Sequence, residues 1–176
     1  MTLNSCCSRQ IDCALCPKTS QGALIYSQYP KGQHFSAEKC TQNCIIFMLK
    51  GELLVNSEEY PGTTLQTRQC ILQAIGSKVE LLALTDVEYL IYWFTELPLL
   101  CEERYKEILE TAHAPLTYTP LTVIPKLERL LDDLTEYFKE QPATCSKYLD
   151  IKCQEIIYIL SCYYPIQQIS TFFYPI

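Results

Sequence analysis

The sequence predicts an α+β protein in which an antiparallel β-domain comes before a helical region. Three observations predict this class. Short apolar runs separated by Gly, Pro and polar turn residues fill the first half of the chain. No helical crossover interrupts these runs, which favours antiparallel pairing in a sandwich or a barrel. After residue 94 the apolar residues recur at steps of three and four, which is the period of a helix.

The predicted strands centre on residues 45–56, where two apolar runs meet at Lys50 and Gly51. Because Gly supplies the positive φ of a tight turn, these two runs are predicted to pair as a β-hairpin. Glu88 is expected to face water, which turns Tyr89, Ile91 and Trp93 of the same strand inward. Further strands are predicted at residues 23–29, 63–65, 70–75, 79–84 and 87–94.

The helical region is predicted to contain several segments. A first helix begins near Thr95, with Pro98 in its first turn, and ends near His113. A connector follows at residues 114–122. A second helix at residues 124–138 carries an apolar seam at steps of three and four, as in a coiled coil or bundle. A third helix begins near Cys145 and ends at Pro165. Residues 166–176 are predicted to form a fourth, short apolar helix. Because no stop signal ends this last helix, we expect the chain to be truncated.

This pattern divides the chain into a Cys-rich tail at residues 1–20, a β-domain at residues 21–95 and a helical region at residues 96–176. A net charge of −6 and a pI of about 5.0 exclude DNA binding by this chain itself, because an acidic chain repels the phosphate backbone. Residues 156–176 carry no charged side chain. Pro165 and several polar side chains interrupt this stretch, so no membrane span is predicted.

Eleven cysteines are present, and residues 1–20 lack the apolar core of a secretory leader. We therefore expect reduced thiols and a cytoplasmic protein. Cys13 and Cys16 have the C-x-x-C spacing that lets two thiolates share a metal ion or form a disulfide. Together with Cys6 and Cys7 they form either a metal or redox site or a set of free thiols on a tail, and the sequence leaves both open.

Residues 22–176 resemble the N-terminal half of AraC-type transcription regulators of Bacteroidetes. The resemblance is carried by LKGELLVN at residues 49–56, by Tyr60-Pro61-Gly62, by the Leu-rich helix 124–138 and by the aromatic stretches at residues 163–165 and 172–175. It implies a cupin-like β-barrel of the double-stranded β-helix or jelly-roll type that binds a small effector. It also implies a helical region that forms a homodimer, and a DNA-binding domain with two helix-turn-helix units that is missing from this chain.

The sensor pocket is expected inside the barrel, lined by alternate residues of each strand. The candidate ligand contacts are Tyr26, His34, Glu38 and Trp93, although aromatic and polar residues of this kind also serve as packing residues in small barrels. The candidate dimer interface is the seam of the second helix, Leu127, Leu131, Leu134 and Phe138.

Metal-dependent cupins use a His pair, a Glu and a later His as ligands, and this chain has only His34 and His113. No catalytic residue, metal or cofactor is therefore predicted, and the chain is expected not to be an enzyme. The alternative is a free-standing cupin-like protein, either a small-molecule-binding protein or a small enzyme. The sequence does not identify the effector.

Overall fold

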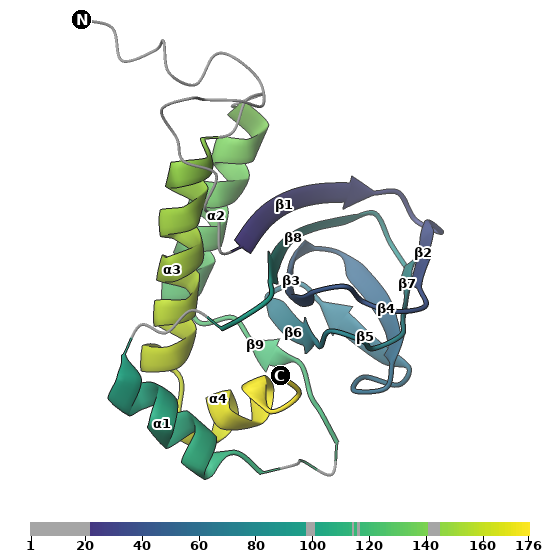
Figure 1. Ribbon diagram of the computed structural model, residues 1–176. Helices are drawn as coiled ribbons and strands as arrows, with labels where there is room; N and C mark the ends of the chain where they lie inside the picture. The colour runs from purple at the N-terminus through teal and green to yellow at the C-terminus, as the bar shows by residue number, and fades with distance from the viewer. Residues whose placement is uncertain (1–21, 98–100, 114, 116, 141–144) are drawn as a thin grey trace, which may run out of the picture.

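The computed structural model describes residues 22–97, 101–113, 115, 117–140 and 145–176, which form a β-domain with helices along one side (Figure 1). The strands are β1 (Gly22–Tyr29), β2 (His34–Ala37), β3 (Asn43–Lys50), β4 (Glu52–Ser57), β5 (Thr63–Gln66), β6 (Gln69–Gln73), β7 (Val79–Ala83), β8 (Val87–Phe94) and β9 (Leu121–Thr122). The helices are α1 (Glu102–Thr111), α2 (Pro125–Glu140), α3 (Ser146–Tyr163) and α4 (Ile166–Phe173). The hypothesis of a site at Cys6, Cys7, Cys13 and Cys16 lies outside the described residues.

The described strands form two antiparallel sheets. Sheet A has the strand order β1-β8-β3-β6-β9, and sheet B has the order β2-β7-β4-β5. Most strands that are neighbours in a sheet are distant in sequence, because the chain passes back and forth between the two sheets. The predicted α+β organisation, with an antiparallel β-domain followed by helices, is confirmed.

The prediction that the two runs of residues 45–56 pair as a hairpin is wrong. Gly51 between β3 and β4 has the expected positive φ of +87°. However, β3 pairs with β6 and β8 in sheet A, whereas β4 pairs with β5 and β7 in sheet B. A Cβ atom at Gly51 would collide with the carbonyl oxygen of Asp86, so the crossing between the sheets requires glycine at this position.

Strand β3 shows that each face of sheet A packs against a different apolar core. Its residues are buried from Asn43 to Met48, because strands flank both of its edges and packed layers cover both of its faces. Ile46 and Met48 belong to a core between the two sheets, whereas Ile45 and Phe47 belong to a second core on the outer face. Sheet A therefore separates two apolar cores.

The second core lies between sheet A and the helical layer. Helices α2 and α3 lie side by side next to β1 (Figure 1), and α1 packs against α4. Phe47 and Tyr92 from the sheet and Leu127 and Leu134 from α2 are all completely buried in this core. Burial of a side chain of this size stabilises the fold by about 1.5–3 kcal/mol relative to exposure.

Two residues join the helices to one another and to the sheet. The hydroxyl of Tyr164, directly after α3, donates to the carbonyl of Thr122 (2.8 Å) and accepts from the N–H of Ile124 (3.1 Å). Arg104 of α1 donates to the carbonyl oxygens of Ser161 (2.8 Å) and Tyr164 (3.3 Å). A cation at this position is favourable because the last carbonyls of a helix lack intrahelical partners and carry partial negative charge.

Helices α2, α3 and α4 confirm three of the predicted helical segments. Two differences lie before them. Strand β9 occupies the end of the predicted connector, where Cys70 pairs with Leu121 at the edge of sheet A. Helix α1 begins at Glu102, later than the predicted start at Thr95, and residues 98–100 lie outside the described residues.

Candidate ligand site between the two sheets

The inward face of β8 is as the sequence predicted. Tyr89 belongs to the core between the sheets, and Ile91 and Trp93 pack against it. Trp93 is thus one predicted ligand contact that the structure places at the interior of the β-domain.

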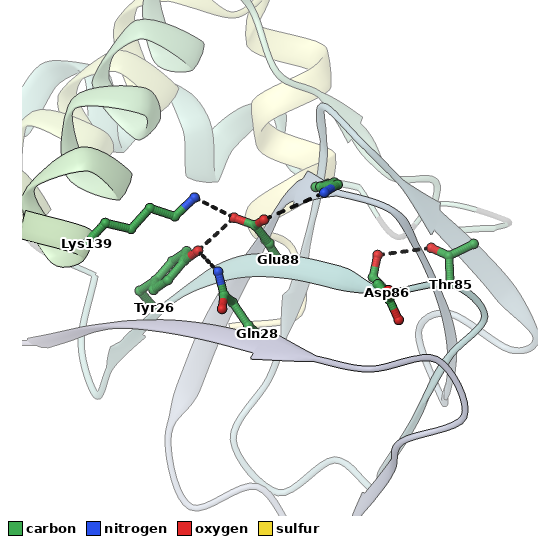
Figure 2. A network of polar contacts seen from close by, with 7 residues as sticks. Tyr26, Gln28, Thr85, Asp86, Glu88 and Lys139 are labelled. Carbon is green, nitrogen blue, oxygen red and sulfur yellow. Dashed lines mark hydrogen bonds and ion pairs between the residues drawn. The ribbon is translucent and has the colours of Figure 1, made fainter.

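Tyr26, a second predicted contact, lies on the other face of sheet A. Its ring stacks on that of Phe138 in α2, with centroids 6.2 Å apart. Its hydroxyl donates to Glu88 at 2.7 Å, and Glu88 also pairs with Lys139 of α2 at 2.8 Å (Figure 2). Glu88 therefore faces the end of α2 as well as solvent, and Tyr26 links a helix to the sheet instead of lining the interior.

The charges of this network support one another. The Lys139 ammonium and, secondarily, the Tyr26 hydroxyl hold the pKa of Glu88 below its ordinary value of 4.5. Burial, followed by the hydrogen bond to Glu88, raises the pKa of Tyr26. The carboxylate is consequently ionised and the phenol protonated at neutral pH, which is the state in which all three groups are paired.

His34 and Glu38 are both exposed. Glu38 pairs with Lys78 at 3.2 Å, with side chains that are 84% and 54% exposed. Exposed pairs of this kind contribute little to stability. Neither predicted contact lines the interior of the β-domain.

The polar groups that do lie at the interior come from β4, β6 and the loop between β4 and β5. Gln73 is completely buried and lies opposite Cys44, a member of the interior core. Its Nε2 donates to Ser57 Oγ (3.1 Å), which also accepts the N–H of Tyr60 (3.1 Å). The Oε1 atom of Gln73 and the Oε2 atom of Glu59 are buried and have no hydrogen-bond partner within the described part of the chain.

These two acceptors are the chemical feature that sequence reasoning missed. A buried polar atom without a partner costs about 1–3 kcal/mol. A signal was present, because strand alternation places Gln73 on the same face as Ile71, which is an interior residue. Glu59 lies in a loop, and no periodicity identifies its position.

Two cysteines lie close to this polar group. Burial raises the pKa of both Cys40 and Cys44, with Glu59 contributing in the same direction, so both thiols are protonated at neutral pH and are poor nucleophiles. Among the residues that the structure describes, no group of three His, Cys, Asp or Glu side chains is arranged to hold a metal ion. The arrangement suits recognition of a ligand by hydrogen bonds.

The leucines of the predicted dimer seam are buried in the single chain. Leu127, Leu131 and Leu134 are 0%, 3% and 0% exposed in the single chain and belong to the core beneath α2. Phe138 packs against the same core and stacks on Tyr26. The leucine seam of α2 therefore packs within the single chain, and the homodimer itself stays a prediction.

Three comparisons relate this chain to known proteins, and the similar solved structures each cover less than half of it. No protein-family model matches the chain, and no curated protein does. Among solved structures, an RmlC-like cupin with a double-stranded β-helix fold from Methanocaldococcus jannaschii is similar, with 11% identity and a TM-score of 0.41 over 44% of this chain and 72% of that one. The DMSP lyase DddQ from Ruegeria pomeroyi has 18% identity and a TM-score of 0.41 over 46% of this chain and 42% of that one.

A predicted oxalate decarboxylase from Thermotoga maritima is also similar, with 14% identity and a TM-score of 0.38 over 42% of this chain and 65% of that one. The expectation that the chain is not an enzyme is withdrawn, since the proteins of similar structure include one enzyme and one predicted enzyme. At these identities the likeness concerns the fold and assigns no activity to this chain. Along the described residues, no helix combines the length and apolar composition that crossing a membrane requires.

Proposed function

We propose that this chain is the effector-sensing and dimerisation part of an AraC-type transcription regulator of the cytoplasm. A small-molecule effector binds at the interior of the cupin-like β-domain, and the helical layer forms a homodimer. DNA is contacted through helix-turn-helix units outside these 176 residues, because this chain carries a net charge of −6.

The observation that carries the sensing role is the pair of unpartnered acceptors, Gln73 Oε1 and Glu59 Oε2. Both atoms are buried, so solvent does not satisfy them. An effector with N–H or O–H donors would pair with them and gain affinity. Apolar interior residues close to Gln73, such as Cys44, which lies opposite it, and Tyr60, would contact the rest of the effector.

Replacing Gln73 with Met tests this role, because Met has a similar size and no hydrogen-bonding amide. The variant loses one hydrogen bond to Ser57 but also loses an unpartnered buried atom, so its free energy of unfolding in urea should stay within about 1 kcal/mol of the parent. A loss above about 2 kcal/mol would show that the amide is fully paired in the folded protein and serves the fold.

The surface that suits dimerisation is the outer face of α3. Ile151 and Tyr158 are 55% and 46% exposed and are seven residues apart, so they lie on one face of the helix, and exposed Cys162 continues this face. Large apolar side chains aligned on an exposed helix face are typical of association surfaces. We therefore assign the homodimer contact to α3.

Light scattering of the parent and of Ile151→Lys/Tyr158→Lys tests this assignment. The parent should have the mass of a dimer and the variant the mass of a monomer, because each interface would place lysines against one another. Ile75→Lys is the matched control, since Ile75 is also 55% exposed but lies after β6 in the β-domain. A monomeric parent, or a dimeric double variant, would contradict the proposal.

The second candidate function is a free-standing cupin-like protein that binds or transforms a small molecule. It is favoured by the names of two structural neighbours, a DMSP lyase and a predicted oxalate decarboxylase. It shares the ligand site at Gln73 with the first proposal and differs from it in requiring neither a dimer through α3 nor an attached DNA-binding domain.

A further inference from the structure

A cleft of about 550 Å³ lies where α1 and α4 meet the end of sheet A. It is outside the interior of the β-domain and shares no residue with the polar group around Gln73. Its size falls within the range of about 300–1,000 Å³ that is typical of small-molecule sites. The apolar part of its wall includes Leu97, Tyr105, Ile108, Phe173 and Tyr174.

One polar side chain in this wall has no partner. Ser170 of α4 is 1% exposed, and its Oγ forms no hydrogen bond with any described residue. The neighbouring Thr171 differs, because its hydroxyl donates to the carbonyl of Gln167 four residues earlier, at 2.9 Å. The two hydroxyls also line different hollows, since Thr171 faces a second one beside Tyr60 and Tyr118. Ser170 thus keeps an unused donor and acceptor at the wall of the first cleft.

The other buried polar side chain of the wall, Asn43, already has hydrogen-bond partners. Asn43 accepts the N–H of Ile75 at 2.7 Å and donates to the carbonyl of Thr95 at 3.1 Å. These bonds fix the edge of the cleft between the start of β3 and the end of β8. Ser170 is therefore the buried hydroxyl of the wall that is available to a ligand.

The charge of the wall restricts the ligand further. Glu96 is the one charged side chain among the described residues that line the cleft. A carboxylate disfavours an anionic ligand, while the tyrosine and phenylalanine rings favour aromatic surface. We propose that this cleft binds a small, neutral, largely aromatic molecule that forms a hydrogen bond with Ser170. This inference does not rest on the regulator proposal, because the cleft involves neither the interior site nor the outer face of α3.

Fluorescence titration with N-phenyl-1-naphthylamine tests the proposal. This probe is neutral and aromatic, carries one N–H donor, and becomes brighter in apolar surroundings. The full 176-residue chain should bind it at one saturable site. Ala112→Trp should weaken this binding strongly, because Ala112 lines the cleft and the indole would occupy part of its volume. Ser170→Ala should weaken binding about threefold to tenfold, the equivalent of one hydrogen bond.

The matched control is Ser161→Ala, which removes the hydroxyl of a buried serine that lies in α3 and outside the wall of the cleft. It should change the affinity less than twofold. The anionic analogue 8-anilinonaphthalene-1-sulfonate should bind more weakly than the neutral probe, since Glu96 repels it. Absence of saturable binding, equal binding by Ala112→Trp, or tighter binding of the anionic analogue would overturn the proposal. If Ala112→Trp does not fold, Ser170→Ala decides, and an unchanged affinity would overturn it.

Discussion

Helices α2 and α3 both carry regular apolar patterns, but they use them differently. The Leu127, Leu131 and Leu134 seam of α2 is buried against sheet A and α3 within one chain. α3 has a buried face too, and it additionally exposes Ile151 and Tyr158 on its outer side. Periodicity therefore identifies an apolar face without identifying what covers it. A dimer surface is instead the apolar face that remains exposed after the chain has folded.

The largest expected effect comes from placing a charge in the α2 seam. Leu134→Asp should cost about 3–5 kcal/mol, because an unpaired carboxylate would be buried in the core. Urea unfolding followed by circular dichroism should therefore show a partly or fully unfolded protein, and not a folded monomer. A folded, monomeric Leu134→Asp variant would instead indicate that the α2 seam is the dimer interface. Glu136→Asp, at an exposed position of the same helix, is the control and should match the parent.

A milder pair of substitutions measures how deeply each helix face is buried. Leu131→Ala should lower the free energy of unfolding by about 2–5 kcal/mol, because it leaves a cavity in the core. Ile151→Ala, on the exposed face of α3, should cost a monomer less than about 0.5 kcal/mol. Urea titration at low protein concentration, where dimers dissociate, measures both. Equal losses in the two variants would mean that both faces are buried within one chain.

The smallest effect concerns the link between α2 and β8. The pKa of Glu88 is lowered in the folded protein by Lys139 and Tyr26, so its contribution is present above the ordinary value of 4.5 and is lost as the pH falls through the lowered folded-state value. Glu88→Gln should cost about 0.5–1 kcal/mol at neutral pH, as expected for a partly exposed ion pair.

This cost should disappear at acidic pH, where the parent loses the same interaction. Stability measured from neutral pH to about pH 3, below the ordinary carboxyl pKa, would show the two proteins converging. Curves that stay parallel over the whole range would rule out a role for the Glu88 charge. Glu136→Gln, which removes an exposed carboxylate of α2, should stay close to the parent throughout.

Features that depend on neighbouring residues were predictable from the sequence. The run at residues 87–94 became β8 with its predicted inward face, and Pro165 separates α3 from α4 as expected. The pairing of β3 was not predictable in this way. Its partners β6 and β8 come from distant segments, and a glycine turn of positive φ occurs both in hairpins and in crossings between sheets.

The candidate site was also predictable only where it depends on local sequence. Alternation along β8 placed Trp93 correctly, whereas Tyr26 has a polar hydroxyl that suits a ligand site and a helix contact equally well. The unpartnered atoms of Gln73 and Glu59 depend on which groups fail to meet in three dimensions. A missing hydrogen-bond partner cannot be recognised from the local sequence.

We propose that this chain is the sensing and dimerising part of a DNA-binding regulator. The most direct test is to sequence the native gene past the codon for Ile176 and translate the reading frame. We expect roughly 100 further residues with a basic character and two helix-turn-helix patterns. A stop codon directly after Ile176 would contradict the claim and favour a free-standing cupin-like protein.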